Sequence, residues 1–178
     1  ARSEDALNVV DTDLVLERVF LGDARSDALD LDFCTARLSD IVVERCGNDA
    51  LDLGGSVAER DRLTVRNAGD KGISVGEMSR LSARDVHITG AKVGLGCKDL
   101  SSLDIERGEA RDCGIGLAVY RKKAQFGPAT LLASAFALPG AGIPYRLEPG
   151  CVLRMDGREM APNARGVEQA LYGETDEP

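Results

Sequence analysis

The hydrophobic pattern of the chain repeats every 22 residues. In each repeat a small residue is followed by an aliphatic residue, a variable residue and a second apolar residue. The six copies of this motif begin at Ala6, Ala28, Ala50, Gly72, Gly94 and Gly116. Apolar residues at alternate positions are typical of a strand with one buried face. We therefore expect one internal ladder of stacked side chains, made of Leu7, Leu29, Leu51, Ile73, Leu95 and Leu117.

Each repeat also contains a second strand. Its paired apolar positions are Val19 and Leu21, Ile41 and Val43, Leu63 and Val65, and Val86 and Ile88. The dipeptides Gly47-Asn48, Gly69-Asp70 and Gly90-Ala91 lie between strands, where a tight corner needs positive φ or a short polar side chain. Since no repeat has room for the 10–15 residues of a crossover helix, the pattern predicts an all-β, right-handed parallel β-helix of about six 22-residue turns with an irregular C-terminal cap.

The repeat also predicts how the chain is divided. Residues 1–126 are expected to form the parallel β-helix repeats. Residues 127–160 lose the repeat and gain four prolines, so we expect them to form C-terminal capping strands that fold over or extend the last turn. Residues 161–178 are expected to hold a short helix within 163–172 and a flexible acidic tail.

Composition supports a narrow, repetitive core. Apolar residues make up 43% of the 178 residues but aromatic residues only 4%, which suits a core of small and branched aliphatic side chains. There are five cysteines and no Cys-x-x-Cys pair, so we expect most of them to be small buried side chains rather than zinc ligands. The net charge of −8 argues against a nucleic-acid partner. No apolar run approaches the roughly 18 residues of a membrane span, so no membrane insertion is expected.

The stretch from Val43 to Leu53, with a strand, a polar corner and then Ala50-Leu51-Asp52-Leu53, resembles the repeats of the pectin-lyase-like superfamily. The resemblance covers residues 6–120, and it implies a β-helix that either acts on polysaccharides or serves as a noncatalytic surface protein. The stretch from Gly116 to Pro128 also resembles β-helix segments beside spore-coat-H-type kinase domains of bacterial surface proteins. The polygalacturonase pattern is incomplete, because the single histidine, His87, lies between Val86 and Ile88 and not in a Gly-His-Gly.

Three aspartates form a candidate metal site. Asp30 and Asp52 occupy the outward third position of the motif, and Asp32 lies two residues beyond Asp30 on the same face. Stacked carboxylates about 4.8 Å apart repel one another, so a cation, a shared proton or a hydrogen-bond donor is expected nearby. One interpretation is a calcium site with these oxygen ligands. The other is a polar ladder bonded to backbone and water.

A second group of side chains forms a candidate carbohydrate-binding patch at the fifth and sixth turns. Its members are Lys98, Tyr120, Arg121 and Lys122. The patch suits an anionic sugar, while the alternative is a solvated edge whose lysines discourage strand pairing. Asp52 and Arg121 lie three to four turns apart, about 15 Å, so only an extended oligosaccharide could contact both.

The sequence contains no complete catalytic constellation, and its catalytic residues are therefore unknown. The leading hypothesis is a noncatalytic scaffold or carbohydrate-contacting module of a bacterial surface or secreted protein, located outside the cell or on its surface. The alternative is a calcium-assisted polysaccharide lyase or a related carbohydrate-active enzyme, with calcium as the cofactor. Polysaccharide, other domains of a parent protein, and further copies that associate through an end turn are the partners considered.

Overall fold

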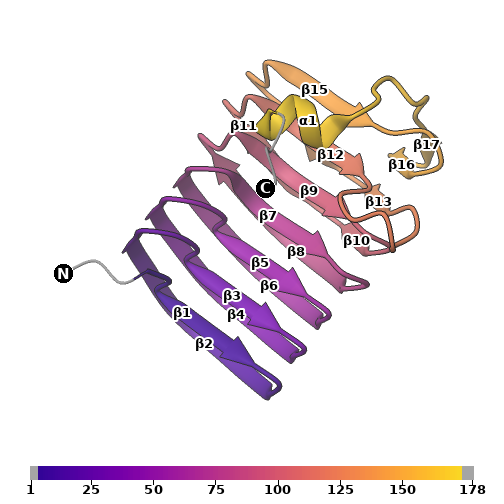
Figure 1. The fold of residues 1–178 in the computed structure, drawn as a ribbon. Coiled ribbons are helices and arrows are strands. Elements are labelled where there is room, and N and C mark those ends of the chain that lie inside the picture. The colour runs from indigo at the N-terminus through magenta and orange to yellow at the C-terminus, as the bar shows by residue number, and fades with distance from the viewer. Residues whose placement is uncertain (1–3, 174–178) are drawn as a thin grey trace.

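The computed structural model describes residues 4–173, which form a parallel β-solenoid of about seven stacked turns (Figure 1). Each turn contributes strands to two sheets. The first sheet has seven parallel strands, namely β1 (Leu7–Val10), β3 (Leu29–Asp32), β5 (Leu51–Gly54), β7 (Lys71–Gly76), β9 (Val93–Lys98), β12 (Ile115–Tyr120) and β15 (Ile143–Leu147). Consecutive strands of this sheet come from consecutive turns, as the repeat predicts.

The second sheet has ten strands. They are β2 (Asp13–Ala24), β4 (Thr35–Cys46), β6 (Val57–Ala68), β8 (Arg80–Thr89), β10 (Ser102–Ile105), β11 (Gly108–Arg111), β13 (Thr130–Ala133), β14 (Phe136–Ala137), β16 (Val152–Met155) and β17 (Arg158–Glu159). The three long strands β2, β4 and β6 each bend near the middle at a left-handed residue, respectively Arg18, Asp40 and Arg62. The bend turns the second half of each strand around the core.

The strand register confirms the predicted internal ladder. Leu7 pairs with Leu29 and Leu29 with Leu51, and Ile73, Leu95 and Leu117 continue the column. The residues from Leu29 onward in this column are almost completely buried, as are the apolar pairs of the second predicted strand from Ile41 onward. All five cysteines are buried and free, so they do pack as small core side chains.

Two of the predicted glycine corners have a different physical cause from the one expected. Gly47 and Gly69 do not have positive φ. A Cβ atom on Gly47 would lie 1.9 Å from the carbonyl oxygen of Arg25, and one on Gly69 would lie 2.1 Å from that of Gly47. These glycines are needed because successive turns touch backbone to backbone. Only Gly90, at φ 71°, needs the left-handed conformation.

The region after residue 126 extends the coil. After a loop, β13 and β15 pair in parallel with β10 and β12 and complete a further turn. Strand β16 then adds to β13, and β17 folds back antiparallel on β16. The residue pairing is offset by 28 between Ser102 and Thr130, not 22, because of the inserted loop, and this explains why the sequence repeat is lost there.

The helix α1 (Val167–Tyr172) lies against the outer face of the seven-stranded sheet beside β12 (Figure 1). It is shorter than the predicted span of 163–172, because Gly166 at its N-cap adopts a left-handed conformation. Asn163 lies outside the helix, where its side-chain oxygen accepts a hydrogen bond from the backbone N–H of Leu147 at 2.9 Å. The predicted flexible tail at 174–178 lies outside the described residues.

Charged side chains on the bends form ladders between turns. Arg62 binds Asp40 through two hydrogen bonds, and Arg107 binds Asp85 at 2.8 Å in the same way. Arg66 lies 3.3 Å from Glu44 on the adjacent strand. Opposite charges 22 residues apart therefore face each other on neighbouring strands, and these pairs belong to the scaffold.

Candidate functional site

The outer face of the seven-stranded sheet collects most of the predicted site residues. We call this surface the aspartate–lysine face. It consists of Asp27, Asp30, Asp32, Asp49, Asp52, Asp70, Lys71, Ser74 and Lys98. The side chains point outward because they alternate with the internal ladder or lie at the corner that precedes each strand. They stack by turn, so residues 22 apart in the sequence are neighbours in space.

Asp30 has the most strongly raised pKa among the aspartates that point outward from β3 and β5. It pairs in register with Asp52, and Asn8 donates a hydrogen bond to its Oδ2 at 2.6 Å. Partial burial, reinforced by the charges of Asp32, Asp52 and Asp27, raises the pKa of Asp30 to about 7. Burial also raises the pKa of Asp32. The predicted crowding of carboxylates is therefore present, and near neutral pH it is relieved in part by a proton.

Lys71 is buried at the centre of the face. Its Nζ lies 2.5 Å from Asp70 Oδ2 and 3.3 Å from Asp49 Oδ1. Burial alone would lower the pKa of Lys71, but the two carboxylates raise it above its ordinary value. The aliphatic stem of Lys71 lies flat over Gly96. A Cβ atom on this glycine would be only 2.7 Å from Lys71 Cδ, so only glycine leaves room for the stem. The amino group of Lys71 is therefore held in a fixed position and stays protonated, so it has no lone pair with which to accept a proton.

Lys98 lies flat in the same manner, and it reaches back across two turns. Its Nζ donates to Ser74 Oγ at 2.6 Å and lies 3.8 Å from Asp52 Oδ1. A Cβ on Gly76 would be 2.8 Å from Lys98 Cε, so the glycine leaves the space that the stem occupies. Sequence analysis treated Lys98 and Asp52 as members of separate sites, whereas the structure brings them together. The glycines at outward positions of the repeat, Gly76 and Gly96, could have predicted that lysine stems from neighbouring turns lie across them.

Helix α1 covers the part of the same sheet that lies next to the aspartate–lysine face. Val167 and Leu171 of the helix pack on Val93, Ala118 and Tyr120. Tyr120 is completely buried beneath the helix. Tyr120 could therefore contact a sugar only if α1 moved away.

Tyr172, the last residue of α1, lies at the boundary between these two parts of the sheet. Its hydroxyl donates to Asp70 Oδ2 at 2.8 Å. Three ammonium groups surround its ring, with Lys92 Nζ at 4.6 Å, Lys71 Nζ at 5.3 Å and Lys122 Nζ at 5.6 Å from the centroid. Such cation–π contacts hold the helix end on the sheet. Lys122 therefore lies at the border of the aspartate–lysine face, to which Lys98 of the predicted carbohydrate patch also belongs.

Arg121 faces a different hollow. Together with Glu148, Arg165 and Glu168 it lines a depression of about 430 Å³ on the far side of α1. Its backbone N–H donates to Glu148 Oε2 at 3.1 Å. The four residues of the predicted patch are therefore spread over three environments, namely the aspartate–lysine face, the space beneath α1 and this hollow. Their role in carbohydrate binding stays a prediction.

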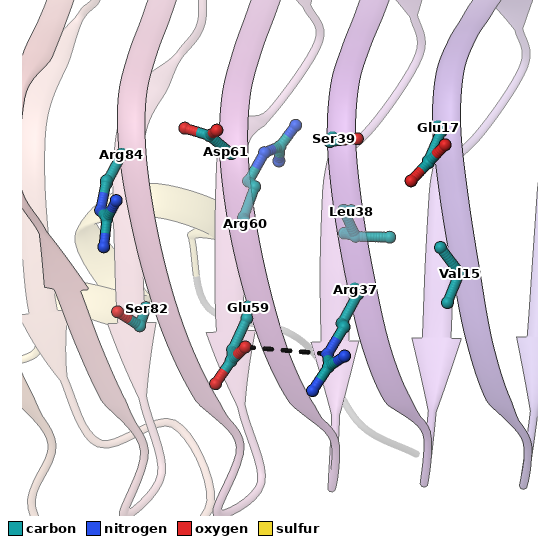
Figure 2. Close-up of a pocket in the computed structure, with 10 residues that line it drawn as sticks. All are labelled: Val15, Glu17, Arg37, Leu38, Ser39, Glu59, Arg60, Asp61, Ser82 and Arg84. Atoms are coloured by element: carbon teal, nitrogen blue, oxygen red, sulfur yellow. Dashed lines mark ion pairs between the residues drawn. The ribbon is translucent and has the colours of Figure 1, made fainter.

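A second surface was missed by sequence analysis. It is a shallow groove of about 520 Å³ that runs across β2, β4, β6 and β8 on the outside of the ten-stranded sheet (Figure 2). Its walls are two outward columns, with Val15, Arg37, Glu59 and Ser82 in one and Glu17, Ser39, Asp61 and Arg84 in the other. Arg37 and Glu59 form an exposed ion pair at 3.9 Å. Opposite charges at 22-residue spacing could have revealed it.

The described part of the chain holds neither a preformed metal site nor a membrane-spanning helix. Within residues 4–173, no three His, Cys, Asp or Glu side chains are arranged to hold a metal ion. The oxygen ligands of Asp30, Asp32 and Asp52 suit calcium chemically but do not form a complete ligand set by themselves. In the same part of the chain, no helix has the length and hydropathy needed to cross a bilayer.

The chain has no significant match to any protein-family model, curated protein or solved structure. The strand register alone therefore defines the fold.

Proposed function

We propose that the chain is a noncatalytic β-solenoid scaffold of a bacterial surface or secreted protein, and that its aspartate–lysine face contacts carbohydrate outside the cell. The observation that carries the proposal is the pairing of charged groups on that face with one another. Lys71 is held between Asp49 and Asp70, and Lys98 between Ser74 and Asp52. A protonated, paired lysine is a hydrogen-bond donor and not a general base.

The shape of the face also supports an extended ligand. Donor and acceptor groups recur at the strand spacing of about 4.8 Å over the turns that carry Asp30, Asp52, Ser74 and Lys98. Polysaccharides present hydroxyl groups along their length, so a row of fixed donors and acceptors suits them better than it suits a small compact substrate.

Incubation with a panel of soluble polysaccharides tests this function. We expect affinity electrophoresis to show retardation by at least one polysaccharide, with no new chain ends formed. Lys98→Met removes a central donor while keeping the apolar stem, and it is expected to reduce the retardation. Arg158→Met, on the exposed strand β17, is the matched control and should leave it unchanged. Turnover of any polysaccharide would contradict the noncatalytic part, and equal behaviour of the two variants would contradict the site.

A second candidate is a calcium-assisted polysaccharide lyase, and the raised pKa of Asp30 favours it. A cation beside Asp30 and Asp52 would relieve the repulsion that now favours a bound proton. This candidate requires further ligands from water or from an acidic sugar. It predicts that Asp30→Ala and Asp52→Ala each abolish calcium binding in calorimetric titration of the metal-stripped protein while the coil stays folded. Asp104→Ala, on the outside of the other sheet, should bind calcium as the wild type does.

A further inference from the structure

One corner of the solenoid exposes a line of large apolar side chains. The corner between the two sheets has a left-handed residue in each of the first three turns and two consecutive left-handed residues in each of the next two, and we call this line the corner ridge. Its first five members are Asp11, Phe33, Gly55, Met78 and Leu100. Backbone hydrogen bonds link the corners, from Asp11 N to Asp32 O, from Phe33 N to Gly54 O and from Met78 N to Asp99 O.

The apolar members of the corner ridge are unusual in two respects. Phe33, Met78 and Leu100 have φ of 55°, 66° and 61°, a conformation that bulky side chains rarely adopt. They are also 66%, 57% and 51% exposed to solvent. Either feature alone would be unfavourable, and their combination in three of the five turns on one edge indicates an interaction surface.

The ring of Phe33 forms a flat plate at the middle of this edge. A Cβ on Gly55 would lie 2.7 Å from Phe33 Cδ1, so the ring rests on the glycine of the next turn. The exposed Val57 follows two residues later. The plate therefore lies between the second and third turns, with its outer surface free to stack against another apolar group.

Charges beside the ridge are arranged so that a second copy of the chain fits best. The outward column next to the ridge runs Asp13, Thr35, Val57, Arg80 in register. A two-fold axis between Thr35 and Val57 would place Asp13 of each copy opposite Arg80 of the other, and it would bring the two Phe33 plates together. Such self-complementarity is what a two-fold interface requires. Glu77, the other acidic group near Met78, is already paired with Lys123.

We propose that two copies of this chain associate side by side and antiparallel through the Phe33 end of the corner ridge, with Met78 of each copy opposite Asp11 of the other. The Phe33 plates meet on the two-fold axis, and two Asp13–Arg80 pairs, one on each side of the axis, fix the register. The interface is lateral, so it is distinct from stacking of end turns. It also leaves the aspartate–lysine face uncovered, so it stands independently of the proposed function.

Phe33→Asn tests the apolar part of the interface. Asparagine tolerates the left-handed conformation at this position, so the variant should keep its fold, which circular dichroism checks. Sedimentation over a concentration series should give twice the chain mass of 18.9 kDa for the wild type and once that mass for the variant. Phe20→Thr removes an equally exposed ring from another face and should remain a dimer. A wild-type monomer at every concentration, or a dimer that survives Phe33→Asn, would overturn the proposal.

A charge exchange tests the antiparallel register. Asp13→Arg and Arg80→Asp should each place like charges opposite one another and give monomers. An equimolar mixture of the two variants should form a heterodimer, because both facing pairs are then again of opposite sign. The double variant in one chain should also form a homodimer. If the mixture stayed monomeric while the wild type was a dimer, the two-fold arrangement would be wrong.

Discussion

At the scale of single residues, Arg60 places a positive charge inside an aliphatic core. It occupies the inward column between Leu38 and Ala83, and it is 5% exposed. Its guanidinium extends from β6 towards β4 (Figure 2), and its three nitrogens have no hydrogen-bond partner in the described part of the chain. Burial lowers the pKa of Arg60 to about 9. The space that it fills is provided by small neighbours such as Ala58.

Replacing this charge by an apolar side chain of similar length should stabilise the fold. Removing buried charges in favour of hydrophobic residues often stabilises a protein by about 1–4 kcal/mol, and we expect Arg60→Met to fall in that range. Equilibrium unfolding in urea measures the change. The matched control is Arg37→Met in the exposed groove, which should change the free energy of unfolding by no more than about 0.5 kcal/mol. A destabilised Arg60→Met variant would mean that the guanidinium has a stabilising partner.

Asp30 makes the stability depend on pH in a direction opposite to that of most carboxyl groups. Its pKa is raised from 3.8 to about 7 in the folded state, so between these values the folded protein binds more protons than the unfolded chain. Stability should therefore fall as the pH rises from about 4 to about 7. Burial also raises the pKa of Asp49 to about 6, against the opposing effect of Lys71, and this carboxyl contributes in the same direction.

Thermal unfolding of the wild type and of Asp30→Asn across this pH range measures the effect. We expect the melting temperature of the wild type to fall towards neutral pH and that of the variant to fall less. The exposed Asp104→Asn should keep the wild-type slope. Identical slopes for wild type and Asp30→Asn would show that Asp30 titrates normally.

At the scale of elements, the strands and the short C-terminal helix were predictable, but the surface that the helix covers was not. Strand positions follow from the alternation of inward and outward residues, which a 22-residue repeat displays many times over. The packing of α1 depends on Tyr172, which contacts Lys71 and Asp70 about one hundred residues earlier. No local pattern encodes that contact. Likewise, the meeting of Lys98 with Asp52 depends on glycines that let the stem lie flat, and not on spacing alone.

Tyr172 should control how firmly α1 is attached. Tyr172→Phe removes the hydrogen bond to Asp70, worth about 1 kcal/mol, and Tyr172→Ala also removes the ring from among three ammonium groups. Hydrogen exchange at the amides of α1 should accelerate in Tyr172→Phe and further in Tyr172→Ala. Amides of β5, which lies deep in the coil, should exchange as in the wild type. Unchanged exchange in α1 would show that Val167 and Leu171 alone anchor the helix.

At the scale of the whole molecule, the protein is an elongated β-solenoid with two chemically different surfaces. Every turn repeats the backbone of the previous one, so a side chain at one position of the repeat forms a column along the coil. The fold class could be predicted because this periodicity is visible in the sequence. For the region after residue 126 the sequence left open whether strands fold over the last turn or extend it, since the inserted loop hides the register by which β13 and β15 form a further turn.

Function at this scale depends on whether the aspartate–lysine face binds a chain of sugars without altering it. The most direct measurement is calorimetric titration of neutral and uronate oligosaccharides into the metal-stripped protein, followed by mass analysis of the recovered sugars. Our account predicts saturable binding without calcium, weaker binding by Lys98→Met, and sugars of unchanged mass. Binding that appears only with calcium, together with shortened or unsaturated products, would contradict the account and favour the lyase. The absence of any binding would contradict both.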